Sequence, residues 1–246
     1  MVCNLCQLEK PLIEAHIVAK CLLKPLFSDE GPLRFISKDV SKYPKRLPTG
    51  VYDSNILCAE CDSSFSPWEE YTADVLFTEA PKYRAFARGG FYAIPTYNYA
   101  KLKLCVLSIL WRMSITKLQE YSMVLLGEKF EREIRAMLIN KEPGAPDLFS
   151  IAWIHLTDYV GSRAAIGPSS TRFNNTTVYN LGLPGFVSVI KIGQPHQPHP
   201  IQPAIMAPDR PLIFGLKEHR LEDDWKPAFQ KIRASQQKKR RKPPLA

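Results

Sequence analysis

The sequence has no apolar run of the roughly 20 residues that a membrane-spanning helix needs. Its densest apolar stretch, residues 104–111, has eight residues and includes Ser108. The first residues contain neither the basic segment nor the apolar segment of a secretory signal. Because 246 residues are enough to build a core without disulfides, the six cysteines are not needed as cross-links. We therefore exclude an integral membrane protein and a secreted disulfide scaffold, and we expect a cytoplasmic protein with no membrane partner.

Acidic residues are absent from residue 231 onward, whereas seven basic residues occur there. The net charge of +9 therefore leaves only +2 for residues 1–230, so the basic character belongs to the tail and not to the fold. Residues 235–246 hold too little apolar surface to order themselves and are predicted to form a disordered basic tail. Its cations suit the phosphates of a nucleic acid, and a merely solubilising tail is the alternative. The run of cations consists of Lys238, Lys239, Arg240, Arg241 and Lys242.

Hydrophobic periodicity predicts an α+β fold. Residues 99–116 are densely apolar and have a length that suits a buried core helix. Residues 127–140 place Phe130, Ile134 and Leu138 on one face of a second helix. Further along, β-branched and aromatic runs separated by Gly, Pro and Asn predict an antiparallel sheet or meander. These runs are residues 149–156, 176–180, 186–192 and 211–216.

Composition divides the chain into four regions. Residues 80–99 are rich in Tyr, Phe, Gly and Pro and are predicted to be an irregular connection. Residues 194–211 are Pro-rich and read as a loop, and residues 218–234 can form a last helix that Pro227 kinks or breaks. A protein partner or a second copy of the chain could bind through the β-rich region. The predicted regions are a cysteine-pair module (1–80), the aromatic connection with the helices (81–144), a β-rich region with the terminal helix (145–234) and the basic tail (235–246).

Four of the cysteines form two pairs, Cys3-x2-Cys6 and Cys58-x2-Cys61. Two thiolates two residues apart supply half of a tetrahedral zinc site, and in a reducing compartment this pattern favours a metal over disulfides. The 51 residues between the pairs exceed the roughly 15–20 of a simple zinc ribbon, so a sizeable segment is inserted between them. We predict one structural Zn2+ on all four thiolates. A redox dithiol, which needs only one pair, and a zinc store are the alternatives.

The residues around the second cysteine pair predict a strand followed by a helix. Residues 50–58 alternate and end apolar, which is typical of a strand, and Asp53 and Asn55 would then point the same way. Ser66 can cap a helix that has a proline at its first position, and Glu69 can complete a capping box. The expected order is therefore cysteine pair, histidine segment, excursion, strand, cysteine pair and helix.

This order and its residues resemble the HNH endonucleases of the ββα-metal superfamily. The resemblance rests on Cys3-x2-Cys6, on Ala15-His16-Ile17-Val18 and on the stretch from Asp53 to Asp62, and it covers about the first 80 residues. In that family two C-x2-C pairs often hold a bracing zinc ion. A His at the end of the first strand is the general base, and an Asn and a second His follow on the second strand and the helix. The resemblance implies a ββα-metal-like zinc module over residues 1–80.

Carried over position by position, the resemblance makes His16 the general base. Asp53 stands where the family's central Asn usually lies, and Asn55 follows two residues later. Asp62 comes directly after the fourth cysteine, where the family commonly has His or Asn, so the second His of the motif is absent. Ala15 replaces the Asp that commonly precedes the base. Because carboxylates suit a hard cation such as Mg2+ or Mn2+, Asp62 can be a metal ligand, and a simple cap or turn residue is the alternative.

The resemblance implies hydrolysis of phosphodiester bonds in DNA or, less expectedly, in RNA. A divalent cation would polarise the scissile phosphate while neutral imidazole takes a proton from water, which suits histidine because its unperturbed pKa lies near neutrality. Ala15 and Asp62 favour the alternative, a catalytically inactive, zinc-braced nucleic-acid-binding or adaptor protein. His16 packed between its apolar neighbours would then be a structural residue. Bacterial or phage (antiviral) defence is a setting that the family suggests.

Other polar residues favour structural roles. Cys21 and Cys105 lie in apolar surroundings and are predicted to be inert core thiols. Arg112, inside the first predicted helix, favours a buried ion pair over a phosphate contact, and His155 fits a core or sheet position. One aromatic and basic group fits ordinary packing better than a stacking surface for a single strand. It consists of Tyr92, Tyr97, Tyr99, Lys101 and Lys103.

Overall fold

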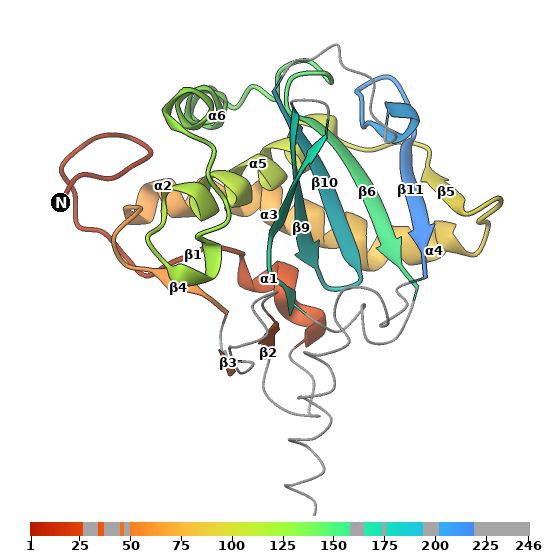
Figure 1. Cartoon of the computed structure of the whole chain (residues 1–246), viewed down its shortest axis with the longest axis horizontal. Helices are drawn as coiled ribbons and strands as arrows, with labels where there is room; N and C mark the ends of the chain where they lie inside the picture. The colour runs from red at the N-terminus through yellow and green to blue at the C-terminus, as the bar shows by residue number, and fades with distance from the viewer. Residues whose placement is uncertain are drawn as a thin grey trace, which may run out of the picture.

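The computed structural model describes residues 1–26, 34–36, 45–46, 50–157, 165–173, 176–193 and 202–218 (Figure 1). The predicted basic tail, nearly all of the predicted terminal helix and residues 194–201 of the Pro-rich loop lie outside these ranges. Within them the chain is a mixture of helices and strands, so the α+β class is confirmed. None of the described helices combines the length and the apolar character that crossing a bilayer requires.

Six strands form the main sheet, and their order in the sheet differs from their order along the chain. Neighbouring strands are antiparallel, with the exception of β11 and β6, which run parallel. The predicted antiparallel sheet is thus confirmed apart from this one pairing. The spatial order is β5 (Phe91–Ile94), β11 (Leu212–Lys217), β6 (Ser150–Leu156), β10 (Phe186–Ile192), β9 (Thr176–Leu183) and β8 (Ser169–Phe173).

Helix α5 (Tyr99–Ile115) is the central element of the core, as its apolar sequence predicts. Thirteen of its 17 residues are buried. The side chain of Asn98 accepts a hydrogen bond of 2.9 Å from the backbone N–H of Lys101, which caps the helix start. Helix α6 (Glu128–Asn140) packs against α5 and buries Ile134 and Leu138, as its amphipathic pattern predicts.

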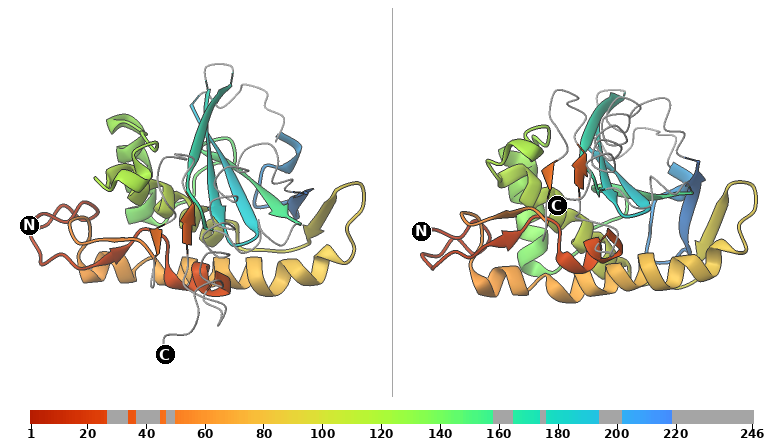
Figure 2. Two further views of the ribbon diagram at one scale, coloured as in Figure 1. Left: turned by 60° about the horizontal axis from the view of Figure 1, so that its bottom comes forward. Right: turned by 90° about the horizontal axis from the view of Figure 1, so that it is seen from below.

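A long continuous helical segment lies along the sheet (Figure 2). It consists of α3 (Ser66–Asp74), the π-helical turn η2 (Val75–Glu79) and α4 (Ala80–Arg84). Pro81 has no N–H to donate, and its ring would clash with the carbonyl four residues earlier in a regular α-helix. The wider π turn relieves this conflict, and the N–H of Ala80 bonds to the carbonyl of Val75 instead. Phe77 of this turn contacts Phe186 of β10, with ring centroids 6.3 Å apart.

The amino-terminal part is built from short elements. Strands β1 (Ala15–His16) and β4 (Tyr52–Asp53) pair antiparallel, and α2 (Ala59–Ser63) follows β4. Helix α1 (Lys20–Leu23) continues into the 3-10 turn η1 (Lys24–Leu26). One cluster of buried side chains reaches from Cys3 to Phe214, so this part shares its core with the main sheet. The remaining elements are a small sheet of β3 (Lys45–Arg46), β2 (Arg34–Ile36) and β7 (Ala165–Ile166), and the 3-10 turns η3 (Gln119–Tyr121) and η4 (Gln202–Ala204).

The predicted strand over residues 50–58 is confirmed only for β4, and its predicted length is wrong. Strand β4 has only two residues, and a turn follows it because the Asp53 carboxylate accepts a hydrogen bond of 2.9 Å from the backbone N–H of Asn55. Asp side chains commonly close turns in this way. Asp53 and Asn55 therefore do not alternate along one strand.

Two further local predictions are wrong. Residues 80–99 are not irregular throughout, because they contain α4 and the edge strand β5. The helix at residue 66 begins as predicted, yet Ser66 does not cap it: Phe65 occupies the cap position and no side chain bonds there. Glu69 makes no capping box because its carboxylate binds Arg112.

Candidate metal centre and the adjoining pocket

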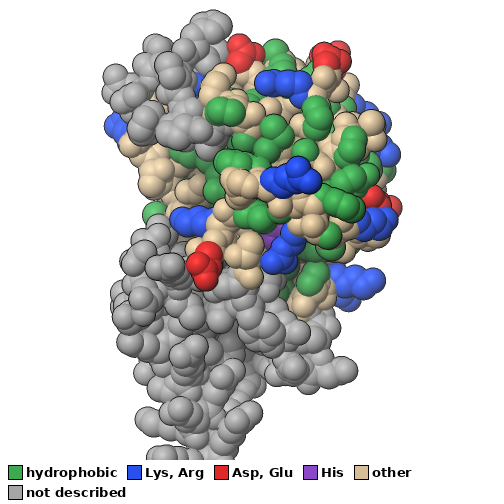
Figure 3. Space-filling view, turned by 90° about the vertical axis from the view of Figure 1, so that its right-hand side faces the viewer, with side chains coloured by type: hydrophobic (Ala, Val, Ile, Leu, Met, Phe, Trp, Pro, Cys, Tyr) green, Lys and Arg blue, Asp and Glu red, His purple; other side chains and the backbone are tan. Residues whose placement is uncertain are grey.

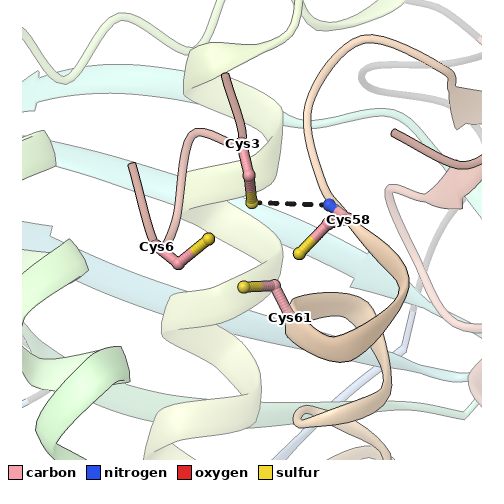
Figure 4. Close-up of side chains that lie close together, drawn as sticks. All are labelled: Cys3, Cys6, Cys58 and Cys61. Atoms are coloured by element: carbon pink, nitrogen blue, oxygen red, sulfur yellow. Dashed lines mark hydrogen bonds between the residues drawn. The ribbon is translucent and has the colours of Figure 1, made fainter. Parts of the chain in front are cut away.

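The four paired cysteines meet at one place. Their Sγ atoms all lie within 4.8 Å of one another. Figure 4 shows the four side chains pointing toward one another. Zinc–sulfur bonds of about 2.3 Å in a tetrahedron put the sulfurs roughly 3.8 Å apart, so a small contraction of the cluster would suit a metal ion. All six cysteines are free thiols. The four sulfurs of Cys3, Cys6, Cys58 and Cys61 can hold a metal ion.

Backbone hydrogen bonds shape the loop of the first cysteine pair. The N–H of Cys3 donates to Leu8 O at 3.0 Å, and the N–H of Gln7 donates to Cys3 O at 2.9 Å. Gln7 takes a positive φ of 61°, which closes the turn after Cys6. The N–H of Cys58 donates to Cys3 Sγ at 3.4 Å, so backbone of the second pair already bonds to sulfur of the first.

The electrostatics of the cluster favour a thiolate at Cys3. Burial raises the pKa of this thiol, but the backbone N–H groups of Cys6, Cys58 and Leu5 lower it, and the pKa falls to about 7. Burial and hydrogen bonds to the other three thiols raise the pKa of Cys61. A thiolate at Cys3 suits a site that binds metal through thiolates.

The backbone pairing that starts at Cys58 continues to His16. Leu12 bridges to Cys58, and the N–H of Ile13 donates to Leu57 O at 3.0 Å. Three residues later His16 pairs with Tyr52 across β1 and β4, and its ring meets the Tyr52 ring at a centroid distance of 6.3 Å.

A pocket of about 210 Å3 lies beside the cluster, and His16 and Asp62 both contribute to its wall. His16 reaches it from β1, and Asp62 from the α2 helix, where its N–H donates to Cys58 O at 3.0 Å. The two cysteine pairs therefore hold both strands of chain that supply these side chains. The lining residues are His16, Ala19, Lys20, Cys21, Asp62, Ser66, Glu69, Glu70 and Arg112.

A buried ion pair underlies the pocket. Arg112 is 1% exposed and donates to the Glu69 carboxylate at 2.5 Å. The same guanidinium donates to the backbone oxygen of His16 at 2.7 Å and to Ser108 O at 3.2 Å. The predicted ion pair of Arg112 is confirmed, and the sequence signal for it was a single cation inside an apolar helix. Glu69 was missed as its partner, because its position also suits a capping box.

The Asp62 carboxyl has a raised pKa. Burial is the main cause, and the negative charge of Glu69 adds to it, whereas the positive charges of Arg112 and His16 act in the opposite direction. Within the described part of the chain the Asp62 carboxylate makes no hydrogen bond. A cation bound in the pocket would compensate the cost of keeping this carboxylate ionised.

Asp53 and Asn55 lie away from this pocket. Asp53 stands opposite Ala15 in the ladder, so it shares a face with Ala15 and not with His16. Its Oδ1 accepts bonds from the backbone N–H and the Nδ2 of Asn55, at 2.9 and 3.1 Å. Its Oδ2 accepts a bond of 2.5 Å from Thr116 Oγ1. In this arrangement Asp53 closes a turn and anchors it to the end of α5.

Several other sequence predictions concern residues that are not candidates for the chemistry of the pocket. Cys105 is fully buried, and burial raises its pKa to about 12, as expected for an inert core thiol. Cys21 is half-buried and lines the pocket, although burial raises its pKa as well. His155 is buried in β6, as predicted. Tyr92 and Lys103, of the aromatic and basic group, are buried, which agrees with the packing interpretation.

No protein-family model, no curated protein and no solved structure matches this chain. The resemblance to HNH endonucleases therefore rests on the motif residues alone.

Proposed function

We propose that this protein is a metal-dependent, HNH-like endonuclease that hydrolyses phosphodiester bonds of DNA or RNA. The observation that carries the proposal is that His16 and Asp62, from distant parts of the sequence, line one pocket beside a four-thiol cluster. Two short antiparallel strands followed by a helix, β1, β4 and α2, also have the order of a ββα module.

Zinc is the metal that we assign to the four cysteines. Sets of four thiolates in tetrahedral arrangement are typical of structural zinc, and a closed set leaves no position for a substrate. The zinc would tie the loop before β1 to the start of α2 and so fix His16 relative to Asp62. Because thiolate ligands persist in a reducing compartment, the proposal includes a cytoplasmic location.

His16 is the proposed general base. Its imidazole lies on the pocket wall, where it could take a proton from a water molecule that attacks a phosphate. Arg112 holds the backbone oxygen of His16 from below, which restricts where the ring can point. Tyr52 contacts the ring from the neighbouring strand.

Asp62 is the proposed ligand of the catalytic cation. Mg2+ or Mn2+, when bound, would polarise the scissile phosphate and stabilise the leaving oxygen. Mg2+ is commonly held by one or two carboxylates together with substrate phosphates. The pocket wall carries the Asp62 carboxylate, which can serve as such a ligand. Asp62 would hold the cation from the protein side, and the phosphate would complete the site.

A second candidate function is a zinc-braced protein that binds nucleic acid without cleaving it. The engagement of Asp53 by Asn55 and Thr116 favours this reading, because it removes the residue at the family's central position from the pocket. His16 and Asp62 would then be the remains of a catalytic set. The predicted contribution of the β-rich region to a protein partner or a second copy of the chain would belong to this role.

The deciding experiment combines metal analysis with a cleavage assay on the full-length protein. We expect one zinc per chain and nicking of a supercoiled plasmid, or cleavage of RNA, in Mg2+ or Mn2+. His16→Ala should lower cleavage by about 100-fold or more without loss of zinc, as expected when a general base is removed. Glu14→Ala is the matched control, because Glu14 is exposed two residues before His16 and does not line the pocket. Intact nucleic acids with wild-type protein and either cation would refute the nuclease and leave the binder.

A further inference from the structure

A basic and aromatic surface lies at the far end of the long helical segment. We call it the hairpin surface. It surrounds the tight turn between α4 and β5, at the edge of the main sheet. Ser66, at the other end of the segment, lines the pocket. At about 1.5 Å per residue, the segment from there to Arg84 is roughly 28 Å long, so the two sites are separate. The hairpin surface consists of Lys82, Arg84, Phe86, Arg88, Phe91 and Lys217.

The turn at the centre of this surface is well fixed. Gly89 and Gly90 take positive φ values of 57° and 81°, which favour glycine and produce a two-residue hairpin turn. Arg88 and Phe91 exchange backbone hydrogen bonds of 2.9 and 3.0 Å across it. The N–H of Leu216 in β11 donates to Gly90 O at 2.7 Å and ties the turn to the sheet. The side chains that flank the turn are therefore presented from a rigid base.

Two phenylalanines on either side of this turn are exposed to solvent. Phe86 is 77% exposed, and Phe91 is 54% exposed. Phe91 lies over Gly215 of the neighbouring strand, where a Cβ atom would come within 3.6 Å of its ring. One part of the Phe91 ring is thus supported by the sheet while the rest faces water. Exposed rings held in this way are suited to stacking against a flat partner.

Cations surround these rings. Lys82, Arg84, Arg88 and Lys217 are all exposed. Glu79, which pairs with Lys82 at 2.7 Å, and the exposed Glu218 are the nearby carboxylates in sequence. Figure 3 shows this side of the molecule, where green and blue side chains alternate and the few red ones lie toward the rim. The surface therefore attracts an anionic partner.

We propose that the hairpin surface binds single-stranded nucleic acid, with bases stacked on Phe86 and Phe91 and phosphates held by the surrounding cations. Stacking platforms combined with cations that follow the backbone are the general means of binding single strands. A duplex would satisfy the cations but keep its base faces covered. An acidic peptide would also leave both rings without a flat partner. A membrane is disfavoured because the tip of the hairpin is Gly89–Gly90, which offers no side chain to insert. This proposal does not depend on cleavage at His16.

The test measures binding of full-length protein to a fluorescein-labelled oligothymidylate by fluorescence anisotropy. Phe86→Ala should raise the Kd by about 5- to 100-fold, the effect of losing one stacked base, whereas Phe86→Tyr should retain binding. Arg88→Gln should lower the salt dependence, the slope of log Kd against log salt concentration, by about 0.7. Leu125→Ala is the matched control, because Leu125 is 76% exposed but lies in the connection between α5 and α6. The basic tail is present in every variant, so its contribution cancels.

Other outcomes of the same test would overturn the proposal. Equal Kd values for wild-type protein, Phe86→Ala and Leu125→Ala would exclude the hairpin surface as the binding site. Equal loss of affinity for duplex and single strand would show that stacking is not involved. Displacement of the oligonucleotide by polyglutamate at equal charge, or a Phe86-dependent preference for phosphatidylserine vesicles, would assign the surface to a protein or a membrane. Binding measured without added Mg2+ or Mn2+ needs no cleavage, so failure of the nuclease and failure of this proposal are separable.

Discussion

Arg112, in the last third of α5, donates a hydrogen bond of 2.7 Å to the backbone oxygen of His16. The same guanidinium binds Glu69 in α3. One side chain therefore joins the central helix, the long helical segment and β1 under the pocket. The cysteine cluster brings the chain before β1 to the start of α2. The position of His16 thus depends on a buried ion pair as well as on the proposed zinc.

Breaking the buried ion pair should be strongly destabilising. Arg112→Leu leaves the Glu69 carboxylate, which is 7% exposed, without its partner, and an uncompensated buried charge costs about 3–5 kcal/mol. Urea unfolding monitored by circular dichroism would measure the loss. Glu79→Gln, which removes a more exposed pair with Lys82, should cost less than about 1 kcal/mol. Similar losses for both variants would contradict a special role of the buried pair.

Removing one cysteine of the cluster should abolish metal binding. Cys58→Ser replaces a thiolate with a hydroxyl, which is a poor zinc ligand, so we expect loss of zinc and a clear fall in Tm because metal binding is coupled to folding. Cys21→Ser should keep its zinc, since Cys21 lies outside the cluster. Metal content by mass spectrometry and Tm by calorimetry provide the two readouts. A Tm of wild-type protein that is unaffected by a zinc chelator would argue against a structural metal.

The sequence predicts those features that depend on nearby residues or on one strong chemical preference. Helices α5 and α6 follow from local periodicity, and β10 has the predicted bounds. The cysteine cluster could be predicted because four thiols in two close pairs share one common partner, a metal ion. Strand β5 could not be predicted, because its four residues become a strand by pairing with β11 at the far end of the chain.

In the pocket, too, the sequence predicts what depends on neighbouring residues and misses contacts between distant ones. The sequence marks His16 and Asp62, because each lies next to a recognisable motif. It does not reveal that Glu69 turns away from its helix start to bind Arg112, since the two residues come from different helices. It also hides the role of Asp53, whose partner Thr116 is 63 residues away.

Asp53 and Asp62 should respond differently to loss of charge. Asp53→Asn keeps an oxygen that can accept the Asn55 N–H, so we expect a small change in stability and continued cleavage. Asp62→Asn should leave stability nearly unchanged but reduce Mg2+-dependent cleavage, because an amide is a weaker ligand for a hard cation. Plasmid nicking at several Mg2+ concentrations would distinguish the two. Equal loss of cleavage in both variants would show that Asp53 takes part in the cleavage reaction.

The buried His155 should make the protein sensitive to acid. Burial lowers its pKa from 6.5 to about 4, and its Nδ1 lies 2.7 Å from the Tyr92 hydroxyl. Between these pH values His155 is protonated in the unfolded chain but neutral in the folded protein. The free energy of unfolding therefore falls as the pH drops from about 6.5 toward 4. The loss at pH 4.5 should approach about 2–3 kcal/mol.

The double variant Tyr92→Phe/His155→Phe removes the titrating ring without leaving the hydroxyl unpaired. Urea unfolding at several pH values should show a shallower decline for the double variant than for wild-type protein. Parallel declines would mean that His155 takes up its proton in the folded state as easily as in the unfolded chain.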